Sequence, residues 1–427
     1  MSAVVVGAGL AGLVAARDLL LAGESVDIFE AEDFPGGLVA RQPVGGTLVD
    51  GGAEAFALRT SVVTDLCAEL GLEVAEPQGQ PHIWWPEAPH RWPMANGVLG
   101  IPGSLEDPSM TGALSVDELA VAALDVRMGG KVAADETRLG PLVEARLGHA
   151  VVEKLVEPVT RGVYGRSPYD MDVDKTAPGL RAGMREHGSL VAAVAAIRQP
   201  GTAAVAQPVG GLFRLVDALA ADIQRLGGRL HTGLPVQQLH HDGYGWELRS
   251  RSGPVRGDRV LLAVGALAAA RLLAPLGVKF DVPPTHPSFQ ALLSLRHPGL
   301  ASGPVGSGVI VGRRDPRLVA RALTHYSLKW PWAGVGGHHV LRLAYAGSPT
   351  LTQALSDASL LLGVTLEQRE VLDFAVLDWE MPTAMPTDEL TALRLRLARL
   401  DGLAVTGAWV AGNGIAAVVA AAKEVVA

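Results

Sequence analysis

The chain opens with an apolar run of strand length followed by apolar residues at helical spacing. Ser2–Val6 is the apolar run, and residues 13–22 carry the helical pattern. Residues 25–30, Ser-Val-Asp-Ile-Phe-Glu, have the pattern of polar and apolar side chains expected of a second strand. Because glycines separate the first strand from the helix, the pattern predicts a βαβ unit that starts at the beginning of the sequence.

Further patterns of the same two kinds follow along the chain. Helical spacing predicts helices over residues 61–71, 115–123, 138–156, 210–226, 354–361 and 390–397. Strands are predicted over residues 229–232, 246–250, 259–264, 340–344 and 403–406, and residues 286–347 read as a turn-rich sheet. Nucleotide-binding elements therefore recur at the start, middle and end of the sequence.

This order predicts an α/β fold with a discontinuous Rossmann-like domain that two insertions interrupt. The predicted Rossmann-like domain comprises residues 1–57, 205–265 and 375–427. A mainly helical inserted domain is expected over residues 58–204, and a sheet-rich substrate-binding domain over residues 266–374.

Two uncharged stretches resemble export or membrane signals. Residues 1–16 lack a basic region ahead of them, which argues against a signal peptide. Residues 403–422 are long enough to span a bilayer, but Thr406, Asn413 and three glycines interrupt them. A strand, a glycine turn and a buried helix fit this stretch better, so we expect no transmembrane span; peripheral contact with a membrane stays open.

Composition narrows the range of functions. The 427 residues include 36 basic and 44 acidic ones, a net charge of −8, which excludes a broad basic face for nucleic acid. The 48% of hydrophobic residues is a globular share. Cys67 is the one cysteine, so no internal disulfide can form, and we expect a reducing, cytoplasmic location. Its helical surroundings favour a core position for Cys67.

A phosphate-binding motif follows the first strand. Gly7, Gly9 and Gly12 form G-x-G-x-x-G, in which glycines permit a tight turn, approach to a pyrophosphate and close helix packing. The helix N-terminus then offers free N–H groups to the phosphates. Glu30 ends the second strand, where a carboxylate can accept hydrogen bonds from ribose hydroxyls. The whole arrangement predicts a dinucleotide site.

Two later glycine segments extend this hypothesis. Gly36-Gly37 suits the longer cofactor FAD better than a nicotinamide, although an ordinary loop explains the pair equally well. Gly407 to Gly414 runs from a strand into a helix whose N-terminus could stabilise negative charge on a reduced flavin. A plain strand-to-helix turn is the alternative there.

Several blocks, in order along nearly the whole chain, resemble the oxygen-dependent protoporphyrinogen/coproporphyrinogen oxidase family of the flavin amine oxidase superfamily. The distinctive ones are E-P-x-x-x-G-V-Y-G at residues 157–165 and K-W-P at residues 329–331. The others are residues 5–30, 50–56, 71–72, 100–102, 188–190, 210–212 and 407–415, with Trp379. The overall look is most similar to the soluble, actinobacterial-type members.

The resemblance implies an amine-oxidase/PHBH-like fold, one non-covalent FAD, a porphyrinogen substrate and O2 as electron acceptor. The predicted FAD contacts combine the residues that the resemblance implies with Gly37 and Gly407 from the glycine segments above. They are Gly7, Ala8, Gly9, Leu10, Ala11, Gly12, Glu30, Ala31, Gly37, Leu38, Gly51, Gly52, Ala53, Glu54, Val236, Trp379, Gly407, Asn413, Gly414 and Ile415. Two positions depart from the family pattern: Leu38 replaces a basic residue, with Arg41 as a nearby substitute, and residues 381–388 differ after Trp379.

Four propionates on coproporphyrinogen call for cations around the substrate. Arg59, Arg161, Arg166 and Arg181 are the candidates, each with a solvated or structural role as the alternative. Arg59 and Lys329 are candidate positioning residues; Lys329 precedes two tryptophans and suits a cation–π contact, a flavin-proximal role or simple packing. No general base is assigned, because hydride loss to a flavin depends mainly on positioning.

The two histidine pairs, at residues 240–241 and 338–339, do not predict a metal site. Adjacent residues on a strand point to opposite faces, so neither pair chelates easily. The expected activity is FAD-dependent oxidation of coproporphyrinogen III by O2 with release of H2O2, in haem synthesis, with hand-off to a downstream pathway enzyme left open. The alternatives are a protoporphyrinogen IX oxidase, another flavin-dependent amine or natural-product oxidase, and a flavin-binding relative without turnover.

Overall fold

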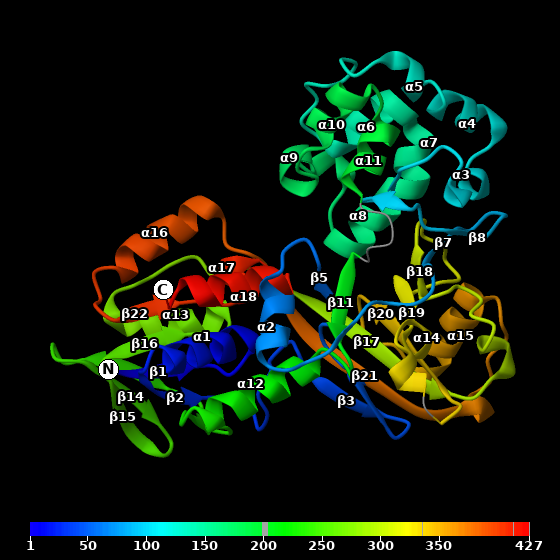
Figure 1. The fold of residues 1–427 in the computed structure, drawn as a ribbon. Coiled ribbons are helices and arrows are strands. Elements are labelled where there is room, and N and C mark those ends of the chain that lie inside the picture. The colour runs from blue at the N-terminus through cyan, green and yellow to red at the C-terminus, as the bar shows by residue number, and fades with distance from the viewer. Residues whose placement is uncertain (199–203, 335, 413, 427) are drawn as a thin grey trace. The chain divides into compact units, whose positions relative to one another are not determined.

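The computed structural model describes residues 1–198, 204–334, 336–412 and 414–426 (Figure 1). These residues form two compact units. Unit 1 comprises residues 1–76, 203–288 and 377–427, and unit 2 comprises residues 77–202 and 289–376. The helical and the sheet-rich stretches thus fall into one unit, whereas the sequence predicts a separate domain for each. Three separate segments of the chain build unit 1.

Unit 1 is built on a parallel five-stranded sheet in the order β12-β2-β1-β16-β22. These strands are β1 (Ser2–Val6), β2 (Ser25–Phe29), β12 (Arg229–His231), β16 (Arg259–Leu262) and β22 (Leu403–Val405). The other strands of the unit are β3 (Arg41–Val44), β4 (Thr47–Asp50), β5 (Phe56–Ala57), β6 (Val74–Ala75), β11 (Val205–Pro208), β13 (Gln238–His241), β14 (Trp246–Ser250) and β15 (Gly253–Gly257). Its helices are α1 (Leu10–Leu21), α2 (Val62–Glu69), α12 (Phe213–Arg225), α13 (Ala266–Leu273), α16 (Thr387–Leu397), α17 (Ala408–Ala411) and α18 (Ile415–Glu424).

Alternation along β1 separates two cores on the two faces of this sheet. Ala3 and Val5 pack with α1, α2, α12 and α18, whereas Val4 and Val6 pack with β14, α13 and α16. Such a strand, buried on both faces, reads as a continuous apolar run, which explains why the βαβ unit is clear in the sequence. The helices α1, α12 and α18 lie together in Figure 1.

Unit 2 combines a sheet with a helical stretch. The seven-stranded sheet has the order β21-β17-β20-β19-β18-β7-β8, and all the pairs whose register is known are antiparallel except β18 with β7. Its strands are β7 (His82–Trp84), β8 (Arg91–Pro93), β17 (Thr285–Leu295), β18 (Gly308–Val311), β19 (Ala322–His325), β20 (His339–Tyr345) and β21 (Val371–Pro382). Helices α14 (Tyr326–Lys329) and α15 (Leu351–Leu362) accompany the sheet. The boundaries between the units fall within β17 and β21.

The helical stretch has a core of its own. The hairpin of β9 (Gly97–Val98) and β10 (Ile101–Pro102) precedes it, and its helices are α3 (Pro108–Ala113), α4 (Val116–Ala122), α5 (Asp125–Met128), α6 (Leu139–Leu147), α7 (His149–Val151), α8 (Glu157–Tyr164), α9 (Val173–Thr176), α10 (Leu180–His187) and α11 (Leu190–Ile197). The helix predicted over residues 138–156 is broken at Gly148 and continues through a π-helical turn, Val152–Val156, ahead of Pro158. Pro158 lacks the backbone N–H that would donate to the carbonyl four residues earlier in a regular α-helix. This missing hydrogen bond accounts for the irregular π-helical turn just ahead of it.

Within the described residues, no helix combines the length and the apolar character needed to cross a membrane. The uncharged stretch 403–422 is divided among β22, α17 and α18, as the glycines in it predict.

Candidate cofactor site

The glycine turn after β1 depends on Gly7 and Gly12. Gly7 adopts φ +101°, and its N–H donates to Phe29 O at 2.7 Å. A Cβ on Gly7 would lie 2.5 Å from Ala263 O, and one on Gly12 would lie 1.9 Å from Gly7 O. Both positions therefore need glycine for backbone packing alone.

Gly9 differs, because no protein atom lies within 4 Å of the place where its Cβ would be. Its φ of −66° is ordinary, and it is the N-cap residue of α1, which starts without a side-chain cap. The first-turn N–H groups of this 12-residue helix thus border open space. A diphosphate fits such a cradle, since the N–H groups and the positive helix end both favour negative charge.

The carboxylate of Glu30 is held at the same turn. Its Oε2 accepts from Ala8 N at 2.6 Å, and its Oε1 accepts from Glu32 N at 3.0 Å. Each carboxylate oxygen has a second lone pair, so a ribose hydroxyl can still donate to it. Leu234 N donates to Glu30 O at 2.8 Å, which brings the half-buried Val236, two residues further on, into the neighbourhood of this strand end.

The Gly36-Gly37 segment packs against the Gly7–Gly12 turn. Gly36 N donates to Ala8 O at 2.8 Å, and a Cβ on Gly37 would be 3.4 Å from the Cα of Gly9. The predicted contact segment 51–54 is joined to the same region, because Ala53 N donates to Leu38 O at 2.8 Å. The sequence motifs at residues 7–12, 37–38 and 51–54 therefore converge in unit 1.

Trp379 on β21 joins this group. Its indole Nε1–H donates to Gly51 O at 2.9 Å, so a residue from the C-terminal segment fixes the 51–54 loop. The resemblance predicts both Trp379 and Gly51 as cofactor contacts, and the structure places them in direct contact with each other.

The C-terminal turn adds a second uncapped helix. Gly407 adopts φ +121°, and α18 begins after Gly414 without a side-chain cap. This helix packs against α1, which connects the turn to the Gly7–Gly12 region, and Ile415 is its first residue. The predicted contact Asn413 lies outside the described residues.

Three further residues lie at or against this turn, and the sequence analysis did not single them out: Trp409, Phe280 and Thr406. The indole of Trp409 donates to Val264 O at 2.9 Å and stacks on Phe280 at 5.4 Å between ring centroids. The buried hydroxyl of Thr406 has no hydrogen-bond partner among the described residues. Such a group at a strand end is available to a water molecule or a polar ligand. No sequence motif marks Thr406, because its significance depends on burial.

The four predicted substrate arginines are divided between the two units. Arg59 is exposed in unit 1, and the other three belong to unit 2. Glu157 accepts from the Arg161 guanidinium at 2.5 Å, and Asp174 pairs with both ends of the Arg181 fork. Arg166 donates to a backbone carbonyl, that of Asp170. Arg59 and Arg166 have no carboxylate partner in the described ranges and remain the better candidates.

Lys329 makes the predicted cation–π contact, with Nζ 5.3 Å from the centroid of the Trp330 ring. It ends helix α14, and both residues belong to unit 2. The histidines 338 and 339 line one cavity together, although their neighbouring positions on a strand predict opposite faces. Among the residues that the structure describes, no group of three or more His, Cys, Asp or Glu side chains could hold a metal ion.

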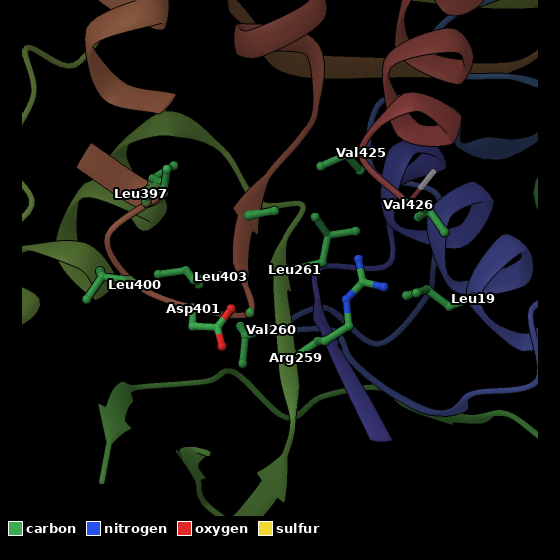
Figure 2. Close-up of a pocket in the computed structure, with 13 residues that line it drawn as sticks. Leu19, Arg259, Val260, Leu261, Leu397, Leu400, Asp401, Leu403, Val425 and Val426 are labelled. Atoms are coloured by element: carbon green, nitrogen blue, oxygen red, sulfur yellow. The ribbon is translucent and has the colours of Figure 1, made fainter. Parts of the chain in front are cut away.

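A cavity of about 240 Å³ in unit 1 lies at the wrong edge of the sheet for a cofactor (Figure 2). It is lined by Arg259 and Leu403, the first residues of β16 and β22, whereas the glycine turn follows the carboxyl end of β1. Ligands of parallel sheets bind at carboxyl ends. Arg259 is also already paired with Glu24 at 2.9 Å, so we assign no cofactor to this cavity.

We expect Glu30→Gln to weaken flavin binding about 10-fold. The new amide can accept from Ala8 N, but its NH2 group faces the Glu32 N–H without accepting from it, and the charge is lost. Quenching of flavin fluorescence during titration of the apoprotein measures the affinity. Glu32→Gln is the matched control, because Glu32 contributes only its backbone here. Equal affinities of the two variants would contradict this role of Glu30.

Comparisons with known proteins agree on one family. The family model described as flavin containing amine oxidoreductase matches residues 10–426. The coproporphyrinogen III oxidase of Mycobacterium tuberculosis strain H37Rv is 32% identical over 461 aligned positions, which cover 99% of this chain and 96% of that protein.

Solved structures show the same fold. A protein from Exiguobacterium sp. 255-15, proposed to be a protoporphyrinogen oxidase, superposes with a TM-score of 0.81 at 25% identity over 100% of this chain and 97% of its own. The cyclohexylamine oxidase from Brevibacterium oxydans IH-35A has a TM-score of 0.64 at 16% identity, over 99% of this chain and 97% of its own.

Proposed function

Because the chain belongs to the flavin containing amine oxidoreductase family, we propose that it is an oxygen-dependent oxidase that converts coproporphyrinogen III to coproporphyrin III in haem synthesis. The observation that carries this proposal is the full-length similarity to the mycobacterial coproporphyrinogen III oxidase. The amine-oxidase fold alone does not select a substrate.

A flavin cofactor follows from the family, and the cradle supports FAD as its form. FAD contains a diphosphate and an adenosine, for which unit 1 offers the open space at Gly9 and the carboxylate of Glu30. Cys67 is fully buried in α2, and burial raises the pKa of its thiol to about 11. A protonated thiol in the core is a poor nucleophile, which supports non-covalent binding.

When bound, FAD would supply two-electron oxidation: each of three rounds would remove a hydride and one further proton from the substrate, and O2 would take up the two electrons and two protons as H2O2, so that one porphyrin forms with three H2O2. The chain contributes binding and orientation. The uncapped N-termini of α1 and α18 hold negative charge on the diphosphate and on the flavin, respectively. We assign the exposed guanidinium groups of Arg59 and Arg166 to substrate propionates, with Arg161, Arg181 and Lys329 as further candidates. We place the enzyme in the cytoplasm, in keeping with its single cysteine.

The test is spectroscopic. Purified protein is expected to be yellow, and adding coproporphyrinogen III in air should produce porphyrin fluorescence and three H2O2 per porphyrin. Protoporphyrinogen IX, assayed on the same preparation, tests the activity proposed for the Exiguobacterium relative. A colourless protein would overturn the proposal. A yellow protein that is inert to both porphyrinogens would also overturn it, in favour of an amine oxidase if it oxidises a primary amine and of a flavin-binding relative without turnover if it does not.

A further inference from the structure

Unit 2 contains a second polar cavity, of about 690 Å³, beyond the carboxyl end of β17. Arg296 and His297, which follow this strand, line the cavity with His338, His339 and Ser327. All of its lining residues belong to unit 2, whereas the residues of the flavin cradle belong to unit 1. The flavin cradle therefore does not account for this cavity.

The charged groups at the cavity are mainly basic. The exposed guanidinium of Arg296 has no carboxylate partner in the described ranges. Three imidazoles accompany it, and Lys329 ends the neighbouring helix α14. The carboxylate of Glu370 lies 3.8 Å from the His297 Nε2. An arginine that faces a cavity beside three titratable imidazoles is suited to an oxyanion.

The charged form of the His339 imidazole is disfavoured by its surroundings. Burial lowers the pKa of His339, and the neighbouring His338 and His297 lower it further. Burial also lowers the pKa of His325, behind the cavity, to about 4. An anion would reverse the repulsion, because a negative charge favours the protonated imidazole.

A hydrogen bond decides which imidazole can take up that proton. His325 Nε2 and His339 Nδ1 lie 3.1 Å apart, so one of these two nitrogens carries the shared proton. His325 is fully buried, and its other nitrogen, Nδ1, has no partner among the described residues. His339 is only partly buried and lines the cavity. A protonated His339 can donate through Nδ1 to neutral His325 and still present Nε2–H to a ligand.

Apart from Gln78, the rest of the lining is apolar or glycine. Pro298, Ala301, Leu328 and Pro331 contribute to it. A small inorganic anion would leave most of this volume unfilled, whereas an organic anion can contact both kinds of surface. We propose that this cavity binds an organic carboxylate, held by Arg296 and His339, and that binding is coupled to uptake of one proton by His339.

Calorimetric titration of the holoenzyme with isophthalate tests the proposal, since both carboxylates of this probe stay ionised between about pH 6 and pH 8. Affinity is expected to rise about 10-fold as the pH falls by one unit over this range, with uptake approaching one proton per probe in buffers of different ionisation enthalpy. Inorganic sulfate is the comparison probe and should bind at least about 10-fold more weakly.

Three variants separate the contributions. His339→Gln should lose the pH dependence and the proton uptake, and Arg296→Gln should weaken binding about 10-fold at each pH. The control His187→Gln changes an exposed histidine of the helical stretch and should match the parent. Flavin absorbance verifies that each variant is folded.

Absence of isophthalate binding, binding independent of pH, or an unchanged proton uptake in His339→Gln would overturn the inference. Sulfate binding as tight as isophthalate would overturn its organic part. None of these measurements needs turnover, so a protein that fails to oxidise porphyrinogens can still pass them.

Discussion

Gly9→Val is expected to give a folded protein that has lost nearly all of its flavin. The new Cβ meets no atom outside the adjoining backbone, because nothing else lies within 4 Å of its position and φ is −66° there. It would instead occupy the open space at the N-terminus of α1, where we place the diphosphate. We expect flavin affinity to fall at least about 100-fold, and the stability of the apoprotein to change by less than about 1 kcal/mol.

Gly12→Val is the matched comparison three residues away. Its Cβ would meet Gly7 O at 1.9 Å, so the turn itself must move, and apoprotein stability should fall by about 3 kcal/mol. Flavin content from the 450 nm absorbance and urea midpoints of the apoproteins measure both effects. If Gly9→Val retained full flavin content, or if both variants were equally destabilised, the cradle would not be where we place it.

Much of unit 1 could be predicted from the sequence because its information is local. Strand β14 was predicted with its observed bounds, residues 246–250, and its burial alternates as expected of an antiparallel strand with one covered face. Strand β1 was also predicted with its observed bounds, since buried parallel strands carry continuous apolar runs. The helix expected over residues 13–22 is observed as Leu10–Leu21 and starts within the glycine motif itself. The motif leaves α1 without a side-chain cap to mark its first turn.

The contacts that could not be predicted from the sequence depend on the three-dimensional arrangement of the chain. The bond from Trp379 to Gly51 joins residues 328 positions apart, and no local pattern records it. The 12-residue strand β21 was missed because its residues are only partly buried and do not alternate cleanly. The pairing of Arg161 with Glu157 and of Arg181 with Asp174 likewise depends on geometry, so the four arginines look equivalent in sequence and differ in the structure.

The helical stretch depends on one buried ion pair, and Arg146→Leu is expected to cost about 3–5 kcal/mol. Arg146 Nε donates to Asp125 Oδ1 at 2.5 Å, and both side chains are 0% exposed. The guanidinium also donates to the carbonyls of Gly129 and Gly188. Leucine would leave the carboxylate buried without a cation and would remove the donor from the carbonyls of Asp125, Gly129, Val132 and Gly188.

The carboxylate itself also starts a helix, which allows a sharper test. Asp125 accepts from Leu190 N at 3.1 Å and Val191 N at 3.0 Å, at the beginning of α11. Adding Asp125→Asn to Arg146→Leu removes the unpaired charge while keeping an acceptor, so the double variant should regain part of the lost stability. The exposed pair gives the control: Arg161→Leu should change the urea midpoint little, because its i,i+4 bridge to Glu157 is screened by water. A double variant less stable than Arg146→Leu would show that the cost comes from lost packing around the guanidinium, and not from the stranded charge.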